Sequence, residues 1–164
     1  MKPGRERSGD SFLGWLSHYE RMKRWEVRAK QVAETDFMTQ TPDTIDFALA
    51  YFIWAHSLRD WLIEAGSIES SALDGLLNGR REWLLCRDLA NKSRHYNLQK
   101  KPTDKDFIIS YQIDLNAILS GATRQVIGGV YHDGRYYEFS ECIGVISEMW
   151  EAVLNQLGLE RGNP

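Results

Sequence analysis

The amino-acid sequence predicts a mainly α-helical protein, a four-helix-bundle-like domain with a small antiparallel β insertion (a hairpin or three strands) before the last helix. The first observation is that apolar residues recur at steps of three and four along four long segments. The second is that short alternating runs around an Asp-Gly pair separate the last two of these segments. A chain of 164 residues, 43% of them hydrophobic, suits one globular domain.

The domain boundaries follow from the ends of the helical pattern. Residues 1–10 are rich in glycine and charge and predict a flexible leader. A single helical domain is expected over residues 11–158, with the β insertion at about 105–139. Residues 159–164 are expected to form a flexible tail.

The first helix is expected from Ser11 to about Thr35, because apolar residues recur there at helical spacing. Its apolar stripe runs through Trp15, Tyr19, Met22, Trp25 or Glu26, Ala29 and Val32. The other face carries a basic cluster, which is either a solvated surface or a nucleic-acid contact: Arg21, Lys23, Arg24, Arg28 and Lys30.

The second long helix is expected to begin at Thr41-Pro42, since threonine caps helices and proline suits their first turn. Gly66 is a natural end. This helix is apolar almost all round between Phe47 and Trp54, which indicates a central position in the bundle. The inward stripe is predicted to contain Ile45, Leu49, Phe52 and His56.

Two further helical segments follow before the β insertion. A short helical piece is expected over Ser70–Leu77 and a longer helix over Arg80–Tyr96. The longer helix is expected to turn an apolar stripe inward through Trp83, Cys86, Leu89, Ala90 and Ser93.

The β insertion is predicted from alternation and turn chemistry. Alternating residues over 107–113 and 124–131 indicate strands, and His132-Asp133-Gly134 is a strong hairpin signal before a strand over 135–139. The last helix is expected to begin at Ser140. Four ring side chains of the hairpin are expected either to stack on bases or to cover the bundle: Tyr131, His132, Tyr136 and Tyr137.

Composition excludes several classes of protein. The net charge of −3 is unlike that of a duplex-DNA reader, so any nucleic-acid contact must come from a local patch. The two cysteines, Cys86 and Cys142, lie in apolar runs far apart and are expected to be buried free thiols. No signal peptide or spanning segment is recognised, so a cytoplasmic protein without membrane contact is expected. Phosphate-loop, dinucleotide and zinc patterns are missing, and no metal or cofactor is expected.

The polar face of the Arg80–Tyr96 helix is the first candidate site. Arg87, Asn91 and His95 lie on successive turns. Arginine can stabilise a phosphoryl oxyanion and histidine can transfer a proton, so this trio suits metal-independent RNA cleavage. The alternative is a face whose polar groups pair inside the bundle. A neighbouring basic run with Tyr96 interleaved would favour a phosphate backbone, or is solvated loop charge: Lys92, Arg94, Lys100, Lys101 and Lys105.

His56 and Asp60 form the second candidate, four residues apart on one helix face. The carboxylate could orient the imidazole within a site shared with the later helix, or could satisfy a core histidine. In the structural interpretation, a polar network fixes the register of the two helices. That network is expected to include His56, Asp60, Arg87 and Asn91. The polar residues expected to bind a partner or to support the network are His56, Asp60, Asp88, Lys92 and Arg94.

At these residues the chain resembles the HEPN superfamily of helical nucleotide-binding domains. The segment Leu89-Ala90-Asn91-Lys92-Ser93-Arg94-His95-Tyr96 is similar to the ending of the family's RNase motif, with Asn91 and His95 in register. The helix with His56 and Asp60 also resembles that of small bacterial proteins near the superfamily. The resemblance covers roughly residues 42–97 and implies an all-helical fold, a homodimer and, in catalytic members, RNA cleavage without metal.

The sequence departs from that motif at two places. Ala90 stands where the motif has arginine, and Arg87 is separated from His95 by seven residues, beyond the usual spacing. Two functions therefore remain. One is a non-catalytic HEPN-like protein of an accessory locus or mobile element that binds a protein, RNA or nucleotide partner. The other is a HEPN-type endoribonuclease, a toxin or defence component, using Arg87 and His95.

Overall fold

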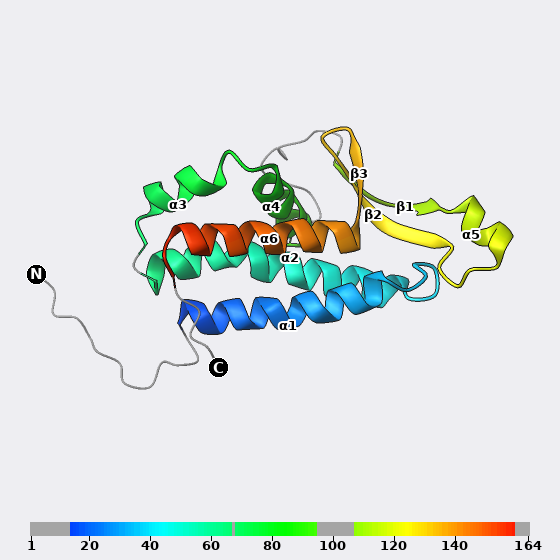
Figure 1. Ribbon diagram of the computed structural model, residues 1–164, viewed down its shortest axis with the longest axis horizontal. Coiled ribbons are helices and arrows are strands. Elements are labelled where there is room, and N and C mark those ends of the chain that lie inside the picture. Colours follow the sequence, from blue (N-terminus) through cyan, green and yellow to red (C-terminus); the bar gives the residue numbers. More distant parts are fainter. Residues whose placement is uncertain (1–13, 67, 95–106, 160–164) are drawn as a thin grey trace, which may run out of the picture.

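The computed structural model describes residues 14–66, 68–94 and 107–159. These residues form a mainly helical structure with one three-stranded antiparallel sheet before the last helix, as the sequence predicts (Figure 1). The helices are α1 (Trp15–Ala33), α2 (Thr41–Glu64), α3 (Ser70–Leu77), α4 (Arg81–Arg94), α5 (Leu115–Ser120) and α6 (Phe139–Gln156). The strands are β1 (Ile108–Ile113), β2 (Val126–His132) and β3 (Arg135–Glu138). The expected leader and the residues from 160 onward lie outside the described residues.

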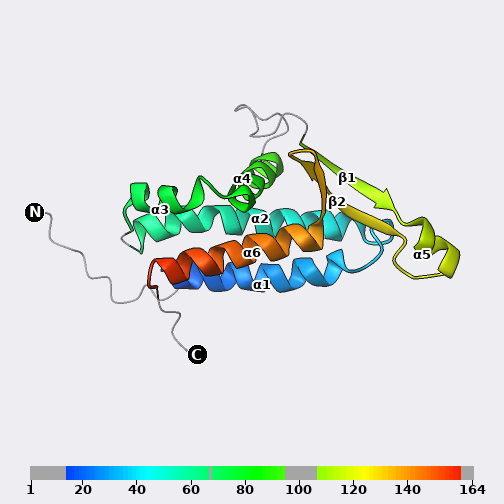
Figure 2. The same ribbon diagram turned by 45° about the horizontal axis from the view of Figure 1, so that its top comes forward.

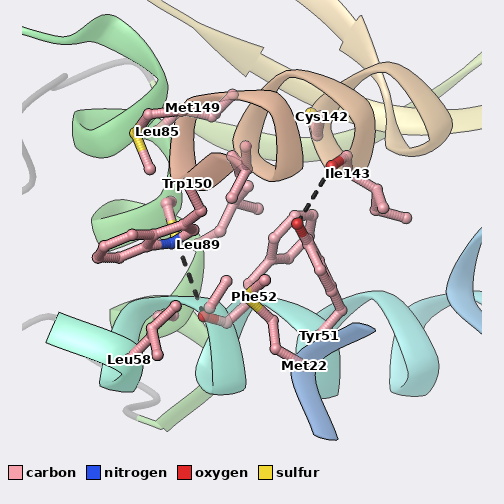
Figure 3. Close-up of a cluster of buried hydrophobic side chains, with 14 of the residues drawn as sticks. Met22, Tyr51, Phe52, Leu58, Leu85, Leu89, Cys142, Ile143, Met149 and Trp150 are labelled. Carbon is pink, nitrogen blue, oxygen red and sulfur yellow. Dashed lines mark hydrogen bonds between the residues drawn. The ribbon is translucent and has the colours of Figure 1, made fainter. Parts of the chain in front are cut away.

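The bundle is built around α2. Helices α1 and α4 pack on α2, and α6 contacts all three, so that the four long helices enclose one core (Figure 1). At the centre of that core, Trp150 of α6 is fully buried and meets the ring of Trp83 edge to face, with ring centroids 5.8 Å apart. The buried Tyr51 donates its hydroxyl to the backbone oxygen of Ile143 at 3.2 Å (Figure 3). The hydrogen bond satisfies a phenol that would otherwise be costly to bury.

The inward face of α2 differs from the predicted stripe. Ile45, Leu49 and His56 are only partly buried. The buried side is instead made by Thr44, Ala48, Tyr51, Phe52, Ala55, Leu58 and Leu62. When a helix is apolar on almost every side, the spacing of its apolar residues does not show which side faces the core. The predicted stripe was wrong for this reason.

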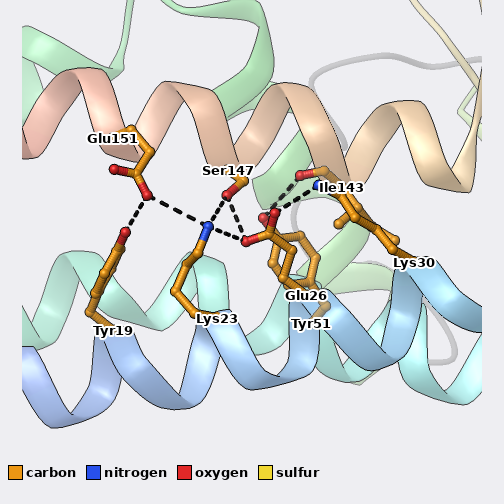
Figure 4. A network of polar contacts seen from close by, with 8 residues as sticks. All are labelled: Tyr19, Lys23, Glu26, Lys30, Tyr51, Ile143, Ser147 and Glu151. Atoms are coloured by element: carbon orange, nitrogen blue, oxygen red, sulfur yellow. Dashed lines mark hydrogen bonds and ion pairs between the residues drawn. The ribbon is translucent and has the colours of Figure 1, made fainter. Parts of the chain in front are cut away.

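A polar network joins α1 to α6 across the core (Figure 4). Glu26, which is 7% exposed, accepts hydrogen bonds from Ser147 at 2.8 Å and from Lys30 at 2.8 Å, and pairs with Lys23. Burial opposes ionisation of Glu26, but these donors outweigh it and lower the pKa of the carboxyl. Two of the five cations predicted to form a basic cluster on the first helix therefore serve this internal network.

The sheet has the order β1-β2-β3. The predicted hairpin turn is confirmed, with Asp133 at φ 51° and Gly134 at φ 73°, the left-handed values that a two-residue turn of this kind requires. Helix α5, between β1 and β2, was not predicted. Asp114 caps it by accepting from the backbone N–H of Ala117 at 3.0 Å, and Gly121 ends it at φ 70°.

The turn between α1 and α2 anchors the sheet to the bundle. The Asp36 carboxylate accepts the backbone N–H groups of Gln125 and Val126 at 2.7 and 2.8 Å, and Phe37 donates its N–H to the oxygen of Val126 at 2.8 Å. The Phe37 ring fills the space over Gly128, where an added Cβ would lie 2.3 Å from the ring. Beyond this anchor, β1, α5 and the start of β2 project past the end of the bundle (Figures 1 and 2).

Candidate functional site

The candidate site lies where the second half of α2 faces α4. Helix α4 carries Arg87 and Asn91 one turn apart, both half-buried, followed by the exposed Arg94. His95, the third member of the predicted trio, lies outside the described residues. The opposing residues on α2 are His56 and Asp60. We call the described residues of this site the α2–α4 polar face: His56, Asp60, Arg87, Asn91 and Arg94.

His56 is held by an aromatic stack rather than by a histidine–carboxylate pair. Its ring lies parallel to that of Trp83 on α4, with an interplanar angle of 2° and centroids 5.1 Å apart. Burial, together with the positive charges of Arg94, Arg87 and Arg59, lowers the pKa of His56 to about 4, against the opposing effect of the Asp60 carboxylate. His56 is therefore a neutral imidazole at physiological pH, within a cationic environment.

Asp60 points outward, with a side-chain exposure of 66%. Its carboxylate accepts from the neighbouring Arg59 at 3.0 Å. Arg59 in turn binds Asp74 of α3 with two parallel hydrogen bonds of 2.7 and 2.8 Å. Arg59 thus joins α2 to α3, and the carboxylates of Asp60 and Asp74 balance its charge.

Arg94 is the most available cation of the α2–α4 polar face. Its guanidinium donates to the side-chain oxygen of Asn91 at 2.8 Å and to the backbone oxygen of Ala90 at 3.2 Å. Within the described ranges, no carboxylate lies within ion-pair distance of Arg94 or of the exposed Lys92. The bond from Asn91 holds the guanidinium along the helix without neutralising it, because the amide carries no charge.

Asp88 does not join the α2–α4 polar face, although the sequence grouped it with His56 and Asp60. It is 2% exposed and accepts from Nε2 of His132 at 3.1 Å, since an ionised carboxylate can only accept. His132 is 5% exposed and contacts the ring of Phe107 edge-on. This buried pair links α4 to the end of β2. The alternation of His132 with the buried Val130 is the sequence signal that could have placed it inward.

Ala90, which replaces arginine in the motif that the sequence resembles, has apolar surroundings. It is fully buried, on the core side of α4 together with Cys86 and Leu89. An arginine at this position would direct its charge into the core instead of toward Arg87 and Asn91. The arrangement can therefore bind an anion but has a core residue where the motif carries its arginine.

Other candidate features of the described residues carry less chemistry. Both cysteines are buried and free, and burial raises the pKa of each thiol. No group of three or more metal-ligating side chains is found among the described residues, and no helix there is long and apolar enough to cross a membrane. A shallow pocket elsewhere is lined by Arg81, Glu82, Leu85, Arg135, Tyr137, Glu141 and Val145. Two of its arginines already bind acids, Arg81 to Asp133 and Arg135 to Glu141.

Comparison with known proteins adds no family to this description. No family model matches the chain, and neither the curated proteins nor the solved structures contain a significant match to it.

Proposed function

We propose that this chain is a non-catalytic, HEPN-like helical protein that binds single-stranded RNA through the α2–α4 polar face. The observation that carries the proposal is the placement of Arg87 and Arg94 beside a neutral, stacked histidine, in a chain whose net charge is −3. Arg94 and Lys92 are exposed cations of the kind that neutralise phosphates. Single-stranded RNA fits a short cationic surface better than duplex DNA does, because a single strand carries less charge per unit length and is repelled less by a chain of negative net charge.

The absence of catalysis is proposed from the position of Ala90. In the resemblance, cleavage depends on an arginine directly before the asparagine of the motif, and here that position faces the core. His56, with a pKa of about 4, stays neutral and can accept a hydrogen bond from a ribose hydroxyl or a base edge. This assigns His56 to ligand recognition.

The test is binding of fluorescein-labelled single-stranded RNA by fluorescence anisotropy with EDTA present, followed by a gel of the recovered RNA. We expect binding and intact RNA. Arg94→Ala and Lys92→Ala should each weaken binding several-fold. For each phosphate that a variant no longer neutralises, the slope of log K against log salt should become shallower by about 0.7. Arg81→Ala is the control, because Arg81 is an exposed arginine of the same helix whose charge is already paired with Asp133.

Two results would contradict the proposal. If Arg94→Ala and Lys92→Ala bind RNA as tightly as Arg81→Ala does, the α2–α4 polar face and the adjacent Lys92 do not form the RNA site. If the RNA is cut in EDTA and His95→Ala abolishes the cutting without changing the melting temperature, the protein is the endoribonuclease that the motif suggests. Binding to a protein partner with no affinity for RNA would likewise replace this function.

A further inference from the structure

The projecting part of the sheet carries an apolar surface that the proposed RNA site does not use. We call β1, α5 and β2 the arm. Its large exposed apolar side chains, with exposed fractions from 39% to 86%, are Ile108, Tyr111, Ile113, Leu115, Ile118, Leu119 and Tyr131. From Phe107 to Thr123 the single charged residue is Asp114, and its carboxylate caps α5. An apolar, nearly uncharged surface of this size marks an interaction site.

The edges of the sheet differ sharply in how they are protected. The edge at β3 is four residues long, carries Arg135 and Glu138, and continues directly into α6. The early part of β2 is covered by Asp36 and Phe37. Strand β1 has six residues in unbroken register with β2, without charge, proline or bulge. Within residues 14–66, 68–94 and 107–159, no charge, proline, bulge or covering segment keeps this edge strand from pairing with another chain.

The hydrogen-bond pattern shows which residues of β1 face the open edge. The backbone N–H of Asp114 donates to the oxygen of Gln125 at 2.8 Å, and these two residues continue the β1–β2 register. In an antiparallel pair, the direction of the backbone groups alternates along the strand. Residues 108, 110 and 112 therefore bond to β2, and Ile109, Tyr111 and Ile113 direct their N–H and C=O groups outward.

The partner strand β2 supports this assignment independently. Val126 lies opposite Ile113 in the register, and its N–H and C=O groups bond away from β1, to Asp36 and Phe37. A residue pair in which one member points away from the partner strand is a non-hydrogen-bonded pair, so Ile113 also points away. In the part of the chain that the structure describes, no hydrogen bond engages the outward groups of Ile109, Tyr111 or Ile113.

We propose that β1 pairs in antiparallel fashion with β1 of a second copy of this chain, across a two-fold axis at Tyr111. In this register Tyr111 lies opposite the same residue of the second copy, and Ile109 lies opposite Ile113. The two sheets then form one continuous six-stranded sheet, β3-β2-β1-β1-β2-β3. The inference is independent of the proposed RNA binding, since it uses the arm and not α4.

A second copy fits this edge better than an unrelated strand, for two reasons. A two-fold interface must be complementary to itself. Here Ile109 lies opposite Ile113, Tyr111 opposite Tyr111 and Ser110 opposite Gln112, so β1 brings no charge to the axis. The seven exposed side chains of the arm also present on the order of 700 Å² per chain, close to the roughly 800 Å² per partner of a standard interface. An edge strand alone, without α5, would offer much less.

The experiment measures the mass of the full chain by light scattering coupled to size-exclusion chromatography, from low micromolar concentration upward. The wild type is expected to be a dimer. Tyr111→Lys and Tyr111→Glu each place two like charges at the axis and should give monomers. An equimolar mixture of these two variants places opposite charges there and should restore a dimer that contains one chain of each kind.

Gln112→Lys is the matched control, because it adds the same charge to the neighbouring residue, on the other face of β1 and away from the axis; it should remain dimeric. Circular dichroism checks that each variant is folded. Tyr111→Pro is a second test. It removes one outward N–H while leaving the bonds to β2, a position at which strands tolerate proline. This variant should also be monomeric.

The proposal is overturned by any of three results. If the wild-type chain is monomeric at every concentration, β1 does not pair with a second copy, and its edge would bind a different partner. Dimers of Tyr111→Lys and Tyr111→Pro at wild-type concentrations would move the interface to another surface. Monomeric single variants whose mixture also stays monomeric would refute the axis at Tyr111. Whether the folded monomeric variants bind RNA has no bearing on the β1–β1 interface.

Discussion

Acid should destabilise this protein in part through His56, which is enclosed against Trp83. The pKa of His56 is about 4 in the folded protein, compared with 6.5 for a solvated histidine. Between these values the unfolded chain binds a proton that the folded chain does not, so stability falls as the pH falls. The stabilisation is complete above pH 6.5 and is lost as the pH approaches 4. A difference of about 2.5 pKa units corresponds to about 3 kcal/mol in all, of which about 2 kcal/mol is lost by about pH 5.

The assay compares urea unfolding of the wild type and His56→Phe at about pH 7.5 and about pH 5. Phenylalanine keeps a flat ring against Trp83 and removes the titrating group. The difference between the two proteins in their loss of stability should be about 2 kcal/mol. The difference is the relevant quantity, because burial also lowers the pKa of His18 on α1 and makes it acid-sensitive in both proteins.

An NMR titration of the imidazole measures the pKa of His56 directly. His56 should titrate near pH 4 in the wild type and at higher pH in Arg94→Ala, since the positive charge of Arg94 is the largest electrostatic cause of the shift after burial. A His56 that titrates between pH 6 and 7 would refute the reasoning. So would a His56→Phe protein that loses as much stability in acid as the wild type.

Two further predictions concern the junction of the bundle and the sheet. His132→Ala takes a donor from the buried carboxylate of Asp88 and should lower the free energy of unfolding by about 3 kcal/mol in urea; a change near zero would show that the pair contributes nothing. Gly129→Ala should cost about 1–3 kcal/mol, because its Cβ would lie 2.2 Å from the backbone oxygen of Tyr137. Gly144→Ala, inside α6 with no atom within 4 Å of the added carbon, is its control and should stabilise the protein by up to about 1 kcal/mol.

The elements that sequence reasoning located well are those with strong local signals. Helix α6 has a clear amphipathic period, and the hairpin has an Asp-Gly turn whose backbone adopts the required positive φ values. Helix α5 was missed because it is only six residues long, too short for periodicity to register. Its cap, Asp114, and its terminal Gly121 are visible in the sequence, and together they are the local signals of a short helix.

The candidate site was less predictable, because its contacts join distant parts of the chain. The partner of Asp88 is 44 residues away on β2, and nothing in the helical spacing of α4 points to it. The stack of His56 on Trp83 likewise depends on how α2 rotates against α4. Since α2 is apolar on nearly every side, that rotation is set by packing and not by its own pattern.

The Phe37–Gly128 contact has a consequence for how this protein can change in evolution. The ring occupies the space of a side chain at position 128, and the adjacent Asp36 binds two backbone groups of the sheet. Lengthening the turn that holds these two residues would withdraw both from β2 together. Insertions and deletions among natural variants should therefore be rare at residues 34–40. The length of this short turn therefore decides whether the bundle and the arm stay packed together.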